Sequence, residues 1–312
     1  MSNRDLAASV RQRLLNQAKA QGRPFQELLQ YYAMERFLYR LGQSRHAEKF
    51  ILKGALLLTA WRAPLSRATM DIDMLGRTSN DLEHIRLLIA QVCELEPEPD
   101  GLQFDRKSIR TARIKEDSDY EGVRVLFRAT LAGARIPMQI DIGFGDVIVP
   151  NAAEVEYPTL LEFSAPVLKA YPKETVIAEK LEAITTLAEL NSRMKDFFDL
   201  WALSRLYAFE GPVLLEAIEA TFEHRSTRIE AFPVGLAKEF GMDKARSAQW
   251  TAFLRRSRLT SAPTIFADVI RAVREFAEPP LSAGSSGEAF ARVWKAGGPW
   301  SGIAADSEKP LA

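Results

Sequence analysis

The sequence predicts an α+β fold in which a domain with a small mixed sheet is followed by a helical bundle. Apolar residues recur at helical spacing before residue 42, strand-like alternation follows between residues 50 and 143, and only helical patterns follow beyond Pro172. With 312 residues, 47% of them hydrophobic and 26% charged, the chain is long enough for two separate cores. We therefore expect a sheet domain with its N-terminal helices at 1–163, a helical domain at 164–278, and a partly flexible tail at 279–312.

Two helices are expected first, because apolar residues from Leu6 to Leu41 recur at helical spacing and Gly22-Arg23-Pro24 interrupts the pattern. The sheet domain then begins with the short apolar run Phe50-Ile51-Leu52. A turn at Gly54 follows, and a short helix is predicted over residues 55–61.

A strand is predicted from Met70 to Leu75, where Ile72 and Met74 alternate with Asp71 and Asp73. The two carboxylates therefore share the polar face of this strand. The rest of the sheet domain is expected to contain a helix that is capped at Asn80-Asp81-Leu82 and runs to about Leu95, and strands over residues 102–113, 123–132 and 138–143, with a turn at Gly133. Asp141 lies on the polar face of the last of these strands.

Beyond Pro158 the pattern becomes helical, with proline or polar residues at the expected starts. The expected helices are Pro172–Leu190, Met194–Tyr207, Pro212–Thr221, Pro233–Phe240, Lys244–Arg256 and Pro263–Phe276.

Composition excludes several classes of protein. The 41 basic residues balance 41 acidic ones, so any contact with nucleic acid must come from a local basic face. The single Cys93 cannot form an internal disulfide, and three histidines do not form a zinc motif. The N-terminus lacks an apolar signal core, and no run of eighteen apolar residues occurs, so we expect a cytoplasmic protein without a membrane span.

The candidate chemistry is transfer of a nucleotide, which needs a divalent metal, a group that holds phosphates, and an acceptor hydroxyl. Asp71 and Asp73 are candidate ligands for Mg²⁺ or Mn²⁺, and Asp141 is a possible third ligand that could accept the proton of the hydroxyl. Gly54 allows close backbone approach to the phosphates of an NTP.

Two later helices add candidate residues. Lys180 lies on the polar side of one helix, where its charge is available to phosphates. Asp196 and Asp199, three residues apart, share one face of the next helix and could orient Lys180 or contact the nucleotide. Arg106 and Arg110 are expected on one strand face, where they could bind phosphate groups along the backbone of an acceptor RNA.

Taken in order, these segments resemble the AbiEii/MenT nucleotidyltransferase toxins of type IV toxin–antitoxin systems, within the DNA polymerase β superfamily. The resemblance spans about Phe50 to Leu203. It rests on a Leu-Lys-Gly segment, Arg-x-Thr-x-Asp-x-Asp, a later strand Asp, an Ala-Glu-Lys-Leu helix and Lys-Asp-x-x-Asp-Leu. One departure is Ala55, where the superfamily favours a serine after the glycine.

The resemblance implies metal-dependent transfer of a nucleotide from an NTP to the acceptor end of tRNA, which blocks translation, and a cognate antitoxin that restrains the toxin. It also implies a control site at Thr69, which matches a position of inhibitory phosphorylation in some relatives. The implied catalytic residues are Asp71, Asp73, Lys180 and Asp196, and the implied nucleotide-binding residues are Lys53, Gly54, Ala55, Arg67, Lys180 and Asp199.

Other interpretations remain open. The acceptor could be a protein hydroxyl or a small molecule, and a chain that keeps the fold could bind nucleotide without catalysis. Asp71 and Asp73 could belong to a solvated strand edge, and Asp141 could face water. Lys180 could be an ordinary surface charge, and Asp196 could pair with Arg193 or Lys195.

Overall fold

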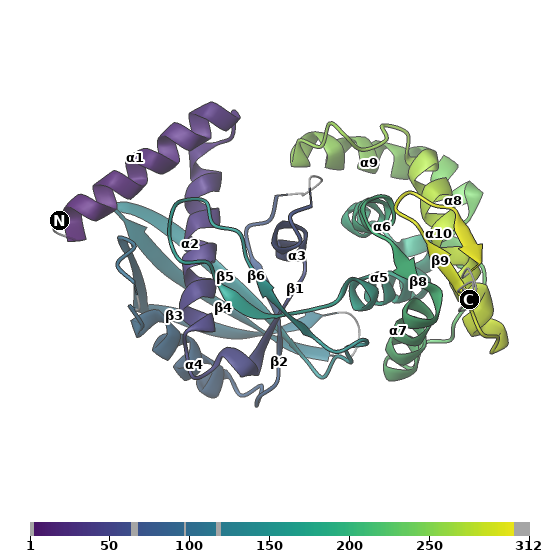
Figure 1. The fold of residues 1–312 in the computed structure, drawn as a ribbon, viewed down its shortest axis with the longest axis horizontal. Helices are drawn as coiled ribbons and strands as arrows, with labels where there is room; N and C mark the ends of the chain where they lie inside the picture. The colour runs from purple at the N-terminus through teal and green to yellow at the C-terminus, as the bar shows by residue number, and fades with distance from the viewer. Residues whose placement is uncertain (1–2, 64–67, 97, 117–119, 303–312) are drawn as a thin grey trace, which may run out of the picture. The chain divides into compact units, whose positions relative to one another are not determined.

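The computed structural model describes residues 3–63, 68–96, 98–116 and 120–302 (Figure 1). The chain divides into two units. The first comprises Met1–Asp146 and Ala152–Tyr171, and the second comprises Val147–Asn151 and Pro172–Ala312. The first is built around a mixed sheet and the second is mostly helical, which confirms the expected α+β class. No helix among the described residues is long and apolar enough to span a lipid bilayer.

Helices α1 (Asn3–Gln21) and α2 (Phe25–Gly42) open the first unit, and the break between them falls at the predicted Gly22-Arg23-Pro24 segment. Helix α2 is buried from Leu28 to Leu41 because it packs across the sheet (Figure 1). This explains why apolar residues occur on nearly every side of it.

Two buried arginines fix α2 to the segment before the third strand. Arg40 Nη1 lies 2.6 Å from Asp100 Oδ2, and Arg36 Nε lies 3.2 Å from the same oxygen. Arg36 also donates to the carbonyl of Ser164 at 2.8 Å. Buried charges are tolerated only when they are paired in this way, so the network holds α2 in one position.

Among the described residues, seven strands of the first unit form one sheet in the order β3-β4-β5-β2-β1-β7-β6. Strands β2 and β5 pair in parallel, as do β1 and β7, and the other neighbours are antiparallel. The bounds are β1 Phe50–Lys53, β2 Ile72–Gly76, β3 Leu102–Glu116, β4 Tyr120–Leu131, β5 Ala134–Phe144, β6 Ala153–Glu156 and β7 Val167–Ala170.

Short helices complete the first unit. A 3₁₀ turn, η1 (Ala47–Lys49), precedes β1, and α3 (Leu56–Ala60) follows it. Helix α4 (Leu82–Glu94) follows β2 and begins at the predicted cap, where the Asp81 side chain accepts a hydrogen bond from the His84 amide at 2.8 Å. The predicted strands β3, β4 and β5 are confirmed, whereas β6 and β7 were not predicted.

The second unit contains the helices expected from the sequence, shifted by a few residues at their ends. Their aromatic residues form its core, in which Phe197 packs edge-to-face on Phe266 with ring centroids 5.3 Å apart. The bounds are α5 Lys173–Leu187, η2 Ala188–Leu190, α6 Met194–Leu206, α7 Gly211–His224, η3 Val234–Leu236, α8 Lys238–Met242, α9 Lys244–Ser257 and α10 Phe266–Ser286.

The largest difference from expectation is the end of α10, which continues through Pro279 and Pro280 to Ser286. Pro280 has no amide hydrogen, so it cannot donate to the carbonyl of Phe276 four residues earlier. The indole of Trp300 donates to that carbonyl instead, at 2.8 Å. Trp300 belongs to a small sheet of β8 (Phe209–Glu210), β9 (Arg292–Trp294) and β10 (Trp300–Gly302), whose order is β10-β9-β8.

Candidate active site

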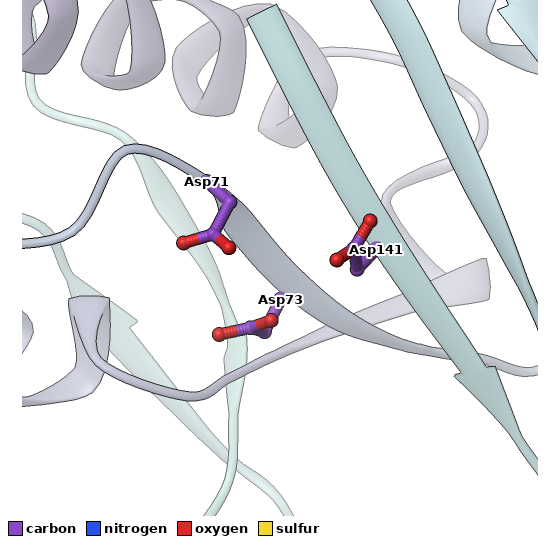
Figure 2. A group of neighbouring side chains, drawn as sticks. All are labelled: Asp71, Asp73 and Asp141. Carbon is purple, nitrogen blue, oxygen red and sulfur yellow. The ribbon is translucent and has the colours of Figure 1, made fainter. Parts of the chain in front are cut away.

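Three aspartates of the first unit converge at the centre of the sheet. Asp71 lies immediately before β2, Asp73 lies within β2, and the parallel register places Asp73 directly beside Asp141 of β5. One carboxylate oxygen from each of the three lies within 4.8 Å of the other two (Figure 2). The predicted alternation holds, because Ile72 and Met74 are fully buried on the opposite face. Oxygen ligands at this spacing suit Mg²⁺ or Mn²⁺.

Gly54 lies directly against this group. Its φ is +75°, a conformation that favours glycine, and a Cβ built on it would lie 1.9 Å from Asp73 Oδ2. The absence of a side chain therefore makes room for the Asp73 carboxylate. Ala55 follows as the residue before α3, and without a hydroxyl it offers only its backbone to a ligand.

Asp141 is held by a basic residue that was not among the predicted site residues. Arg124 of β4 donates from Nε to Asp141 Oδ1 at 2.8 Å and from Nη2 to Oδ2 at 2.7 Å. Gln139 Nε2 donates to Oδ2 as well, at 3.1 Å. The hydrogen bonds to Asp141 raise the pKa of Arg124 against the effect of desolvation, and the charges of Asp71 and Asp73 add to the increase.

The turn between β4 and β5 contains the signal that locates Arg124. Ala132 and Gly133 both have positive φ, at 47° and 80°, as a two-residue type I′ turn requires. Leu131 therefore pairs with Ala134, and counting outward from this pair brings Arg124 opposite Asp141. The predicted turn at Gly133 alone did not fix this register, because Ala132 was expected in the strand and it belongs to the turn.

The segment before β2 is held from two sides. The Thr69 hydroxyl makes a short hydrogen bond to Asp71 Oδ1, and the Thr69 amide donates to the hydroxyl of Tyr31 at 3.1 Å. Gln30 Nε2 donates to the Met70 carbonyl at 3.2 Å and to the Pro137 carbonyl, at the start of β5, at 2.8 Å. These contacts fix the direction of the Asp71 side chain.

Lys53 of β1 pairs directly across from Asp73 in the sheet. Its ammonium lies 2.9 Å from Asp146 Oδ2, which also accepts a hydrogen bond from the Tyr171 hydroxyl at 3.2 Å. Asp146 and Tyr171 were not predicted here, since their approach depends on β7.

Arg67, predicted to bind nucleotide, lies outside the described residues.

The second unit holds a separate charged cluster that joins α5 to α6. Lys180 Nζ lies 2.8 Å from Asp196 Oδ1 and 2.8 Å from Asp199 Oδ2, and Arg193 Nε lies 2.6 Å from Asp196 Oδ2. Burial acts to raise the pKa of Asp196, but the charges of Lys180 and Arg193 outweigh it and hold that pKa below its ordinary value. Lys180 is therefore not an ordinary surface charge.

The open face of the sheet carries basic residues beside the aspartates. Along β4, Arg124, Leu126 and Arg128 are accessible and alternate with buried residues, and Arg135 of β5 is exposed. Because Leu126 pairs with Gln139 and Arg124 with Asp141, these side chains share the face of Asp141.

A β-bulge interrupts β3 near this face. Asp105 pairs with Arg128, but the next pair is Arg110 with Leu126, so residues 106–109 bulge outward. The bulge breaks the alternation that placed Arg106 and Arg110 on one face, and that prediction is wrong in detail, since Arg106 pairs with Glu94 of α4. A shallow cavity of about 260 Å³ lies there, lined by Ser108, Arg110, Leu126, Phe127 and Arg128.

Comparison with known proteins gives a family match over most of the chain. The sequence model of the family described as nucleotidyl transferase AbiEii toxin, type IV toxin–antitoxin system, matches residues 36–278. The match covers the three aspartates and the Lys180 cluster. No curated protein matches the sequence.

Among solved structures, the chain is similar to JHP933 from Helicobacter pylori, with a TM-score of 0.48 and 15% identity over 84% of this chain and 96% of that chain. It is also similar to a candidate nucleotidyltransferase from the same organism, with a TM-score of 0.45 and 16% identity over 85% of this chain and 99% of that chain.

Proposed function

The chain belongs to the AbiEii nucleotidyl transferase toxin family, and we propose that it transfers a nucleotide from an NTP to the 3′ hydroxyl at the acceptor end of tRNA, which blocks translation. One observation supports the metal-dependent reaction most directly: Asp71, Asp73 and Asp141 bring carboxylate oxygens within 4.8 Å of one another. The choice of tRNA follows from the resemblance to the family.

The residues present fit a divalent metal. All three candidate ligands are carboxylates, which Mg²⁺ and Mn²⁺ prefer, and Gly54 leaves open the space that the Asp73 carboxylate occupies. Asp71 and Asp73 would hold the metal, with Asp141 as the third ligand and as acceptor of the hydroxyl proton. When bound, the metal neutralises charge on the phosphates and lowers the pKa of the attacking hydroxyl.

We assign the phosphates of the NTP to the side of Gly54. Its backbone is accessible without a side chain, and β1, which leads into it, is the neighbour of β2 on the side away from β5. Lys180 would supply a positive charge to the β- and γ-phosphates. Asp196 and Asp199 would orient Lys180, because each accepts from its ammonium at 2.8 Å.

We assign the acceptor to the opposite side, over β5 and β4. There, Arg124, Arg128 and Arg135 share a face with Asp141, and the cavity at the bulge adds Arg110. Guanidinium groups bind phosphates through paired hydrogen bonds, so this face suits an RNA strand. Because the net charge of the chain is zero, the electrostatic attraction of an RNA strand would depend on these arginines.

Labelled NTP would test the function. The purified protein is incubated with Mg²⁺, each labelled NTP in turn, and total tRNA, with Asp71→Ala as the matched inactive variant. We expect label on tRNA only with the unaltered protein. Label on the protein itself or on a small acceptor would overturn the choice of tRNA. No label, together with equal toxicity of Asp71→Ala in a growth assay, would contradict the enzymatic function.

Control of the toxin is proposed at two levels. The family implies a cognate antitoxin, and phosphorylation of Thr69 would place about two negative charges beside Asp71, to which its hydroxyl is bonded. We expect Thr69→Glu to abolish transfer, because its charge repels the phosphates and Asp71. Thr69→Val should lower the rate by about tenfold, because only one hydrogen bond to a charged group is lost. Equal rates for the two variants in the labelled-NTP assay would contradict this role.

A further inference from the structure

The contact between Arg124 and Asp141 uses most of the hydrogen-bonding capacity of a candidate metal ligand. A carboxylate accepts about four hydrogen bonds. Arg124 donates one hydrogen bond to each oxygen of Asp141, at 2.8 and 2.7 Å, and Gln139 donates another to Oδ2 at 3.1 Å. Asp141 is therefore already neutralised and largely saturated by side chains of its own sheet.

A divalent metal needs the same oxygens. A metal held by Asp71 and Asp73 would compete with Arg124 for Asp141, because three of its roughly four acceptor positions are filled and the two positive groups repel at this distance, so metal binding favours release of Arg124. Release is feasible because the Arg124 side chain is 40% exposed, whereas that of Asp141 is 9% exposed. The Arg124 side chain can rotate into solvent, whereas the Asp141 carboxylate is buried and stays in place.

We propose that Arg124 is an internal counter-ion of the metal site, which competes with the metal for Asp141 and, once released, binds a phosphate of the acceptor strand. The inference rests on the proposed function and identifies the residue that links metal binding to acceptor binding.

The order of strands determines which substrate Arg124 meets. Across β1, β2, β5 and β4, the register places Lys53, Asp73, Asp141 and Arg124 in one row. Gly54 follows Lys53 at one end of this row, and Arg124 lies at the other. A guanidinium released from Asp141 is therefore on the side away from the phosphate turn, on the same face of β4 as the exposed Arg128. Its new partner is an acceptor phosphate and not the NTP.

Direct measurement of metal binding tests the competition. Free Mn²⁺ is titrated by electron paramagnetic resonance against the full-length protein, Arg124→Gln and Arg124→Lys. We expect Arg124→Gln to bind Mn²⁺ roughly three- to tenfold more tightly, as removal of a partly exposed competing charge predicts. Arg124→Lys keeps the positive charge but cannot donate two parallel hydrogen bonds to one carboxylate. Its affinity for Mn²⁺ should therefore lie between that of the unaltered protein and that of Arg124→Gln.

The chain offers a matched control in Arg128. It lies on the same face of the same strand, and its Nη2 is 3.0 Å from the carboxylate of Asp105. Arg128→Gln should leave the affinity for Mn²⁺ unchanged. Asp71→Asn should weaken it, which shows that the measured site is the group of three aspartates. Thermal unfolding of each variant confirms that it is folded.

The outcomes separate this inference from the proposed function. Tighter binding of Mn²⁺ by Arg124→Gln, with Arg128→Gln unchanged, supports the competition. Equal or weaker binding by folded Arg124→Gln and Arg124→Lys overturns it, even if the unaltered protein binds Mn²⁺ and transfers nucleotides. Absence of Mn²⁺ binding in every variant overturns both.

A second readout addresses the acceptor. Binding of a labelled oligoribonucleotide is measured with and without Mn²⁺. In the unaltered protein Mn²⁺ should strengthen binding, and by linkage RNA should strengthen Mn²⁺ binding by the same factor. Arg124→Gln should show a smaller gain, with the KM for NTP unchanged in the transfer reaction. A rise in the KM for NTP alone would overturn the assignment to the acceptor.

Discussion

At the scale of single residues, Gly54 is the position where backbone geometry most directly shapes the candidate metal site. Its φ of +75° and the 1.9 Å approach of a built Cβ to Asp73 Oδ2 both oppose any side chain. We predict that Gly54→Ala displaces the Asp73 carboxylate, weakens Mn²⁺ binding by at least about tenfold, and lowers the free energy of unfolding by about 1–3 kcal/mol. Mn²⁺ titration and urea unfolding measure the two effects.

Gly133→Ala provides the control. Its φ of +80° is similar, but a Cβ there has no atom within 4 Å. It should therefore lower stability through backbone strain and leave Mn²⁺ binding intact. If both variants bind Mn²⁺ as well as the unaltered protein, Gly54 does not shape the site.

The sequence predicts these residues to different extents. Alternation placed Asp71 and Asp73 on one face, because burial of Ile72 and Met74 allows a single register. Arg124 was not predicted, because its pairing with Asp141 requires that both Ala132 and Gly133 form the turn, whereas the expected strand ran through Ala132. The contact of Lys53 with Asp146 was not predictable, because it depends on strands brought together by long-range packing.

At the scale of elements, α5 and α6 are joined by buried charges. Asp196 and Asp199 are 1% and 3% exposed, and Lys180 bonds to both. Loss of Lys180 leaves buried carboxylates without a main partner, which costs about 3–5 kcal/mol. We therefore predict that Lys180→Met lowers both transfer and the free energy of unfolding measured in urea, whereas Lys195→Met, on the exposed side of α6, changes neither.

The pH dependence of this loss has a definite sign. Because the pKa of Asp196 is lowered in the folded protein, its contribution to stability is full above its ordinary pKa and is lost as pH falls through the folded pKa. The difference between the unaltered protein and Lys180→Met should therefore stay constant at neutral pH and shrink once the pH falls below 3.8, the ordinary pKa of this carboxyl. A constant difference would show that lost packing, and not charge, explains the effect.

Element boundaries were predictable where local signals act and not where tertiary contacts override them. The cap at Asp81 and the break at Gly22-Arg23-Pro24 are local, and both were located correctly. Helix α10 continues through two prolines because Trp300 satisfies the carbonyl that Pro280 leaves open and stacks on Phe276 with centroids 5.8 Å apart. No local pattern contains that information.

At the scale of the whole molecule, the buried carboxyl of Glu35 makes stability depend on pH between 4.5 and about 7. Burial raises the pKa of Glu35 to about 7 from 4.5, against the hydrogen bond that its Oε2 accepts from the Leu160 amide at 2.7 Å. Between these two pH values the folded chain holds a proton that the unfolded chain releases. The free energy of unfolding should therefore fall as pH rises from 4.5 to 7, by at most about 3 kcal/mol.

Glu35→Gln removes this titration and keeps an acceptor for the Leu160 amide. We predict that its urea unfolding free energy changes less between pH 5 and pH 8 than that of the unaltered protein. Glu83→Gln, at an exposed position of α4, serves as the comparison. Parallel pH profiles for Glu35→Gln and the unaltered protein would contradict the prediction.

Because the net charge of the whole chain is zero, the salt dependence of RNA binding should reveal which basic residues contact the RNA. With 41 basic and 41 acidic residues there is no general attraction for a polyanion, so the proposed RNA binding should depend on a local basic group, which we place beside Asp141. Affinity for an oligoribonucleotide should fall as salt rises, because each phosphate contact releases counter-ions. Arg128→Gln and Arg135→Gln should each reduce the slope of log affinity against log salt by about one. Arg86→Gln, which alters the Glu83 pair on α4, should leave the slope unchanged. Equal slopes for all three variants would place the acceptor on another surface.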